Sequence, residues 1–282
     1  MMLHISLRSK VVLFILLSVL GCICAVLSAN VVKHDDHDAA QMLKEDGFLV
    51  MYTTSTDAFG FSRTRITGLE LHLPDFRGKI ENGRALINGT PAMEAIQLCQ
   101  HLYTCDLSNS DVTSNTIGKM TSISKLRLLD LTSTLVDDEL LASLRSNEVL
   151  NELHLDYTLI TDEGLAQLQN SQTLEKLIVG GQFVSGRFLA ALKGNQSIRI
   201  LIVYDSQIDP ELLKILPDTA IETLVLSCKP SEIPVSAIVK SSVTWININW
   251  DEPLDSADKA AKAKMKSAKP GLEVFAGPRN TT

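Results

Sequence analysis

The chain has 282 residues, of which 45% are hydrophobic and 21% are charged, and its formal net charge at pH 7 is −7. This length and apolar content are sufficient for a folded protein with a sizeable core. The negative charge argues against nucleic acid as the main partner, because phosphate binding requires a basic face.

The N-terminal residues predict where the protein is located. Arg8 and Lys10 lie in the segment 1–10, which is expected to be cytoplasmic, and an apolar run of 18 residues follows at 11–28. This run is long enough for a marginal membrane span and is also compatible with a secretory signal. We expect a single-pass anchor with a cytoplasmic N-terminus, because positive charge beside a membrane span resists crossing the membrane. The residues that follow the anchor are then extracytoplasmic. A cleaved signal, which gives a secreted or periplasmic protein, is the alternative.

Two other features of this region leave further alternatives. Residues 19–22 resemble a bacterial lipoprotein box, but apolar residues continue after Cys22 where a polar spacer is expected. Residues 29–38 are interpreted as a spacer, and the run from His34 to Asp38 contains residue types that bind zinc or copper. A solvated spacer is favoured over a metal site, because flexible carboxylates beside histidines define no geometry.

Residues 39–101 are predicted to be the N-terminal cap of a repeat array. A helix is expected at 39–45, a strand at 48–52, and a helix at 91–102 that starts at Thr90. Ile66, Leu69 and Leu71 have the apolar spacing of the later units and indicate a degenerate first unit. A stacked array needs its end covered, and this segment is suited to that role.

From 102 to 250 the chain repeats with a period close to 24 residues. The first position of each unit is apolar, in the order Leu102, Leu126, Leu150, Leu174, Ile198, Ile221 and Val243. Apolar residues recur three and five positions later, a spacing with which a strand points side chains to one face. In the first five units they also recur at positions 15 and 18 after the first, one stripe of a helix. Each unit is therefore expected to contain a strand, a turn and a helix.

The start of each helix is predicted from residues whose side-chain oxygen can accept a first-turn amide. They stand eleven positions into the first five units and are Thr113, Asp137, Thr161, Ser185 and Asp209. In the fifth unit Pro210 follows Asp209, an order that helix starts favour. These residues support the helix assignment independently of the apolar pattern.

The segment from Leu150 to Leu155 (LNELHL), with the residues that follow it, resembles the L-x-x-L-x-L pattern of leucine-rich repeat proteins. Within this family, the chain resembles bacterial-type members that are membrane-anchored or exported. The resemblance covers 102–250 and implies an α/β solenoid, a curved parallel sheet with helices on its convex side. Many members carry asparagine at a turn position where this chain has Ser110, Thr134, Thr158, Gln182 and Ser206. We expect hydroxyl-mediated turns there in place of an asparagine ladder.

The remaining segment, 251–282, is predicted to be a mostly disordered, basic and alanine-rich tail that is helical only transiently. Its lysines are Lys259, Lys262, Lys264, Lys266 and Lys269. The cysteines indicate no disulfide framework. Buried free thiols are expected, and a pair between Cys99 and Cys105 is the alternative.

Binding is expected on the concave face of the sheet, where side chains between the core positions point outward. The candidate residues are Asp106, Asp130, His154, Ile178, Ile200, Ile202, Tyr204, Val225 and Trp245. The first part of this face is polar and acidic, and the second part is apolar. A contiguous apolar patch tends to be a contact site for a protein or peptide. The alternative is that the tail or the cap folds back over it.

The predicted function is a non-catalytic, membrane-tethered protein–protein interaction module with no cofactor and no metal. His154 with Asp130 and Asp156 nearby could imitate an acid–base cluster, but this cluster is open and lacks an evident oxyanion site or activated nucleophile. The alternatives are a substrate-recognition adaptor of a ubiquitin-ligase-like complex and a structural envelope protein. The sequence does not identify the partner.

Overall fold

The computed structural model describes residues 36–56, 62–71, 77–120, 123–145, 147–206, 208–250 and 252–277. The predicted anchor or signal at 11–28, the segment before it, and residues 29–35 of the predicted spacer lie outside these ranges. Of the helices that are described, none has both the length and the apolar character that a membrane crossing requires.

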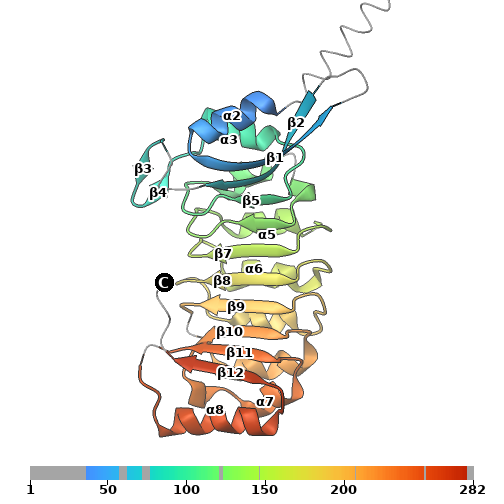
Figure 1. The fold of residues 1–282 in the computed structure, drawn as a ribbon. Helices are drawn as coiled ribbons and strands as arrows, with labels where there is room; N and C mark the ends of the chain where they lie inside the picture. Colours follow the sequence, from blue (N-terminus) through green and yellow to red (C-terminus); the bar gives the residue numbers. More distant parts are fainter. Residues whose placement is uncertain are drawn as a thin grey trace, which may run out of the picture.

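The described strands form one long sheet and a small separate hairpin. In the long sheet β1 is antiparallel to β2, and every later neighbour is parallel (Figure 1). Its strands, in spatial order, are β1 (Phe48–Thr56), β2 (Ser62–Leu71), β5 (Thr104–Asp106), β6 (Leu128–Asp130), β7 (Glu152–Asp156), β8 (Lys176–Gly180), β9 (Ile200–Tyr204), β10 (Thr223–Ser227), β11 (Trp245–Asn249) and β12 (Glu273–Gly277). The hairpin pairs β3 (Ile80–Glu81) with β4 (Arg84–Ala85).

Helices connect the parallel strands and stack on one another behind the sheet in Figure 1. The α-helices are α2 (His37–Glu45), α3 (Pro91–Leu98), α4 (Ser114–Gly118), α5 (Asp138–Leu144), α6 (Asp162–Ala166), α7 (Val235–Lys240) and α8 (Ser256–Ala268). The 3₁₀ helices are η1 (Ile123–Lys125), η2 (Gln167–Asn170), η3 (Arg187–Leu192), η4 (Pro210–Asp218) and η5 (Pro230–Glu232). The repeating strand, turn and helix confirm the predicted α/β solenoid.

The core lies between the sheet and the helices. Every apolar repeat position predicted from the sequence is buried. Equivalent residues of successive units lie side by side, as in the row Leu129, Leu153, Leu177, Leu201, Leu224, Ile246 and Val274. One unit alone could not bury this stripe, so the units stabilise one another through a shared interior.

Four of the five predicted helix caps are confirmed. Thr113, Asp137, Thr161 and Asp209 each accept a hydrogen bond from a backbone amide in the following turn. The fifth prediction is wrong, because Gly186 occupies the start of η3 with φ +87°. The Ser185 hydroxyl instead donates to the Asp162 carboxylate, 2.8 Å away, and so links two neighbouring units.

The turns after β5 to β9 each use a left-handed residue, which is followed by a hydroxyl residue in all of them except the turn after β8, where Gln182 follows Gly181. The left-handed residues are Asn109, Ser133, Tyr157, Gly181 and Asp205. The hydroxyls of Ser110, Thr134, Thr158 and Ser206 donate to backbone carbonyls 2.6 to 3.0 Å away. The predicted hydroxyl-mediated turns are therefore confirmed at these four positions.

The cap at the N-terminal end largely has the predicted elements. Strand β2 pairs with β5 so that Leu69 lies beside Cys105, which confirms a degenerate first unit. Helix α3 begins after Thr90 but ends at Leu98, because Cys99 adopts an extended backbone. The end of the predicted spacer belongs to this cap, since the Asp36 carboxylate accepts a 2.8 Å hydrogen bond from the Ile66 amide before α2. The described cysteines, Cys99, Cys105 and Cys228, are buried, and none of them forms a disulfide bond, as predicted.

The prediction of a disordered tail is wrong for residues 252–277. Helix α8 begins with a reciprocal capping box between Asp255 and Asp258, and β12 pairs in parallel with β11 along its whole length. Met265, Leu272 and Val274 are buried against the preceding unit. The 24-residue period misses this unit because Val274 follows the equivalent Ile246 by 28 residues, and α8 is longer than the earlier helices.

Polar contacts also fasten this last unit to its neighbour. The Asp258 carboxylate accepts the Ser231 amide at 3.0 Å. The Lys269 ammonium donates to the carbonyl oxygens of Ile238 and Ser241 at 3.3 and 2.6 Å, so this lysine is not part of a solvated tail. Residues 278–282 of the predicted tail lie outside the described ranges.

Candidate binding face

The sheet face opposite the helices, called the open face here, carries the predicted binding residues. Asp106, Asp130, His154, Ile178, Ile202 and Val225 form one row across β5 to β10. Ile200 and Trp245 lie in the row two positions before, and Tyr204 lies two positions after. The structure therefore brings all nine predicted residues to one face. Val225 differs from the others because it is only 5% exposed, so it forms part of the floor rather than an accessible contact.

A charged network occupies the middle of this face. His154 Nδ1 lies 2.8 Å from Asp130 Oδ2 on β6, and His154 Nε2 lies 2.7 Å from Glu152 Oε1 on its own strand. The same Glu152 oxygen accepts a 2.6 Å hydrogen bond from the Lys176 ammonium on β8. The alternation of side chains along a strand places Glu152 and His154 on the same face. The network thus joins three neighbouring strands.

The contacts of His154 determine its charge and limit its chemistry. Burial alone lowers the pKa of His154, but its hydrogen bonds to Asp130 and Glu152 and their negative charges outweigh burial and raise it. For Asp130 and Glu152, burial raises the pKa, and the bonds to His154 and Lys176 outweigh it and lower the pKa. Both imidazole nitrogens face carboxylates, so neither is available to a substrate while these contacts persist. The arrangement is that of an ion-pair network that holds the sheet face in shape.

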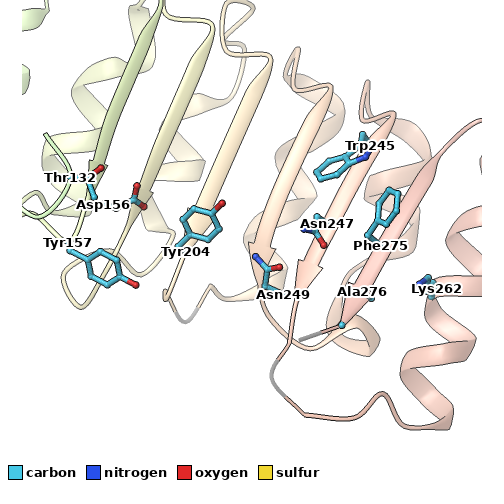
Figure 2. Close-up of a pocket in the computed structure, with 11 residues that line it drawn as sticks. Thr132, Asp156, Tyr157, Tyr204, Trp245, Asn247, Asn249, Lys262, Phe275 and Ala276 are labelled. Carbon is cyan, nitrogen blue, oxygen red and sulfur yellow. The ribbon is translucent and has the colours of Figure 1, made fainter. Parts of the chain in front are cut away.

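A cavity of about 700 Å³ opens on this face beside the network (Figure 2). It extends from the ends of β6 and β7, past the end of β9, to the open-face residues of β11 and to β12. Its lining residues are Thr132, Asp156, Tyr157, Tyr204, Trp245, Asn247, Asn249, Lys262, Phe275, Ala276 and Gly277. Of the nine predicted residues, Tyr204 and Trp245 line it. Lys262 and Phe275 were missed because their segment was predicted to be disordered.

Asp156 is a buried carboxyl group at the β7 end of this cavity. Its residue is 7% exposed, and its Oδ1 atom has no hydrogen-bond partner among the described residues. Burial raises the pKa of the Asp156 carboxyl to about 6; His154 lowers it, and the negative charge of Asp130 adds to the rise. A buried carboxylate without a full set of partners is unfavourable. This cost is not explained by packing within the described chain.

The strand next to Asp156 carries a glycine in the same row. In register, Asp156 lies beside Gly180 on β8, and Gly180 lies beside Tyr204 on β9. A Cβ atom at Gly180 would lie 2.3 Å from the carbonyl oxygen of Tyr204, so the close approach of the two backbones requires glycine. The row of side chains is therefore interrupted between the carboxyl group and the aromatic ring.

Tyr157 adds a second local cost at the same place. It has φ +54°, a left-handed conformation that bulky residues rarely adopt, yet its side chain is 46% exposed. Its hydroxyl donates a hydrogen bond to the Asp205 carboxylate on the next but one unit. At two adjacent positions, Asp156 and Tyr157, the chain thus carries a residue that makes the fold less stable than another residue type would. Such costs concentrate at functional sites.

Replacing Tyr157 with asparagine should raise the free energy of unfolding by about 1 kcal/mol, because asparagine tolerates a positive φ much better than tyrosine. The equivalent residue of the first unit, Asn109, has this conformation already. The matched control is Tyr103→Asn, since Tyr103 is equally exposed at 46% and has no positive φ. Urea denaturation measures the free energy of unfolding of both variants. If Tyr157→Asn loses as much stability as the control, or more, then the positive φ of Tyr157 does not destabilise the fold.

The opposite end of the cavity is aromatic. Trp245 on β11 and Phe275 on β12 have ring centroids 5.5 Å apart with a tilt of 38° between their planes. Phe275 is 49% exposed and stands in register beside Asn247. Figure 2 shows Lys262 beyond Ala276, at the far end from Asp156. The cavity therefore has a carboxyl group at one end, and an aromatic wall with a lysine at the other.

Among the residues that the structure describes, no three histidine, cysteine, aspartate or glutamate side chains are grouped so that they could hold a metal ion. Of the run from His34 to Asp38, the described part starts helix α2, and Asp36 is engaged with the Ile66 amide. His34 and Asp35 lie outside the described residues.

Comparisons with known proteins give a limited result. No protein-family model matches the chain, and no curated protein does. Among solved structures, the LRR ectodomain of the receptor kinase SOBIR1 from Arabidopsis thaliana is similar at 13% identity and a TM-score of 0.26, covering 86% of this chain and 96% of that one. The PEPR1–AtPEP1 structure is similar at 14% identity and a TM-score of 0.30, covering 80% of this chain and 36% of that one. The assignment of the fold depends on the sheet register and the helix stacking described above.

Proposed function

We propose that the protein is a non-catalytic interaction module that binds a protein or peptide on the open face of its sheet. The observation that carries this proposal is the apolar half of that face. Ile178, Ile200, Ile202, Tyr204 and Trp245 lie on β8, β9 and β11 and are only partly buried. Of these five residues, Tyr204 and Trp245 line the cavity. Contiguous apolar side chains around a concave site favour association with another molecule.

The dimensions of this region suit a peptide or a protein loop. Neighbouring strands are about 4.8 Å apart, so the distance from β7 to β12 is about 24 Å. The helices that connect the strands from β5 to β11 pack on the other side of the sheet (Figure 1). Of the described helices, α8 contributes one residue, Lys262, to the cavity lining. A partner can therefore approach the open face without displacing the core.

Site-specific photocrosslinking tests this proposal in the full chain. A photoreactive residue at Ile202, on the open face, should capture a partner, whereas one at Lys214, exposed on η4 behind the sheet, should not. Tyr204→Glu should abolish capture from position 202, because burying a charge at an apolar contact is unfavourable. Equal capture from both positions, or capture unaffected by Tyr204→Glu, contradicts binding on this face and favours a structural role without a discrete ligand.

We also propose that the module is tethered to a membrane by residues 11–28 and faces away from the cytoplasm. The apolar run and the preceding Arg8 and Lys10 support this orientation. Protease added outside intact cells should remove an epitope tag placed at the C-terminus, and deletion of residues 1–28 should leave the protein in the soluble fraction. Cleavage of the tag only from the cytoplasmic side contradicts the tether and favours a cytosolic adaptor.

A further inference from the structure

We propose that the partner segment is a peptide that places a lysine or arginine side chain against Asp156 and an apolar side chain against Trp245 and Phe275. This inference rests on the proposed function and specifies the chemistry of its ligand. It follows from the unequal ends of the cavity.

The case for a cation begins with the charges around Asp156. Oδ1 of Asp156 has no hydrogen-bond partner among the described residues, although the residue is only 7% exposed. The cations closest along the sheet are engaged elsewhere: His154 bonds to Asp130 and Glu152, and Lys176 bonds to Glu152. Asp205 adds negative charge and accepts the Tyr157 hydroxyl. An incoming ammonium or guanidinium group supplies the donors that this carboxyl group lacks.

The shape of the cavity allows a long side chain to reach this carboxyl group. Asp156, Tyr157 and Tyr204 all line the cavity, and Gly180 places no side chain between Asp156 and Tyr204. Figure 2 shows the rings of Tyr157 and Tyr204 near Asp156 on the same face. Aromatic faces attract cations, and they also contact the aliphatic stem of lysine or arginine. The left-handed turn recurs in successive units, and the use of tyrosine at this turn position is then explained by the ring that it presents to the cavity.

The other end of the cavity repels a cation and accepts an apolar group. Lys262 lines this end, and Trp245 and Phe275 form its wall. From β7 to β11 there are four strand spacings, about 19 Å at 4.8 Å each. Trp245 also lies four residues before Asn249, which stands in the row of Asp156, so the offset along the strands is about 13 Å and the direct distance about 23 Å. An extended peptide advances about 3.3 Å per residue, so its basic and apolar residues should be about seven positions apart.

Selection from a displayed library of random linear peptides tests the inference, with the full chain as the immobilised target. Peptides retained by the wild type should combine a lysine or arginine with an aromatic or large aliphatic residue about seven positions away. Asp156→Asn should lower the affinity for the best of these peptides by at least about tenfold, the range expected for loss of a charge-assisted hydrogen bond. Fluorescence anisotropy measures this affinity. A peptide whose basic residue is replaced by glutamine should bind both proteins within about twofold of each other.

The matched control is Glu70→Gln, which removes one negative charge from the same face but lies on β2, outside the cavity lining and outside the nine predicted residues. This control should lower the affinity for the basic peptide by less than about threefold, since the lost charge acts only at long range and is screened by salt. Retained peptides without a basic preference, or equal binding by Asp156→Asn, overturn the cation site and leave the binding face intact. Retention of no peptide overturns peptide binding itself.

Discussion

Replacing Asp156 with asparagine should raise the free energy of unfolding by about 2–3 kcal/mol at pH 7. Burial raises the pKa of this carboxyl from 3.8 to about 6, so ionising it is less favourable in the folded protein than in the unfolded chain. Each pKa unit corresponds to about 1.4 kcal/mol. Asparagine keeps the size of the side chain and removes the charge. Chemical denaturation at pH 7 measures the difference.

The pH dependence separates this effect from packing. Because the folded pKa lies above the unfolded value, the folded protein holds more protons between about pH 4 and pH 6. The contribution of Asp156 to stability therefore falls as the pH rises through this window. The gain in Asp156→Asn should be small near pH 3 and nearly complete by pH 7. A gain of the same size at both pH values contradicts the ionisation of Asp156 as its cause.

Asp130→Asn is the control with the opposite expected sign. Burial raises the pKa of Asp130, but its hydrogen bonds to His154 and Thr132 outweigh burial and lower it, so its charged form stabilises the fold. The same substitution one strand away should therefore lower the free energy of unfolding at pH 7, and the loss should shrink as the pH falls through the folded pKa. A gain in both variants would indicate a general effect of removing negative charge from an acidic protein.

A more stable Asp156→Asn variant that no longer binds a basic peptide would explain why the carboxyl group is present. The same holds for Tyr157, whose backbone conformation is unfavourable for tyrosine. Natural sequences commonly keep such residues where function requires them. Stability and binding should then change in opposite directions at these two neighbouring positions.

The fold could be predicted because the core repeats along the chain. Residues such as Leu153 and Leu177 occupy equivalent positions in successive units, and parallel pairing sets them side by side. The helix starts could be predicted from local capping chemistry at Thr113 and Asp137, whereas Ser185 fails because Gly186 changes the local backbone. Periodicity thus identifies what recurs, and it misses a unit of different length.

The candidate site was predicted only in part, because it depends on what differs between units. The nine predicted residues do share the open face, but the cavity is formed by contrasts across strands: a carboxyl group at Asp156, no side chain at Gly180, and a ring at Tyr204. Asp156 was noted only as a neighbour of His154. The positive φ of Tyr157 has no signal in its residue type. Phe275 depended on recognising β12.

Met265→Asp should lower the free energy of unfolding by about 3–5 kcal/mol, because it places a carboxyl group in a fully buried apolar position. If residues 252–277 were disordered, as the sequence suggested, the same change would have almost no effect. The matched control is Lys264→Asp, one residue earlier on the exposed side of α8, which should change stability by no more than about 0.5 kcal/mol.

Tryptophan fluorescence shows whether the loss in Met265→Asp is local to the last unit. The chain has two tryptophans, and both adjoin this unit: Trp245 contacts Phe275, and the Trp250 amide donates to the Gly277 carbonyl at 3.0 Å. Detachment of α8 and β12 should shift the emission to the red at denaturant concentrations that leave the circular dichroism of the other units unchanged, since repeat arrays can open from their ends. The cavity would then lose Phe275 and Lys262, so peptide binding should weaken together with this shift. Unchanged emission with a full loss of stability would mean that the last unit unfolds only with the whole solenoid.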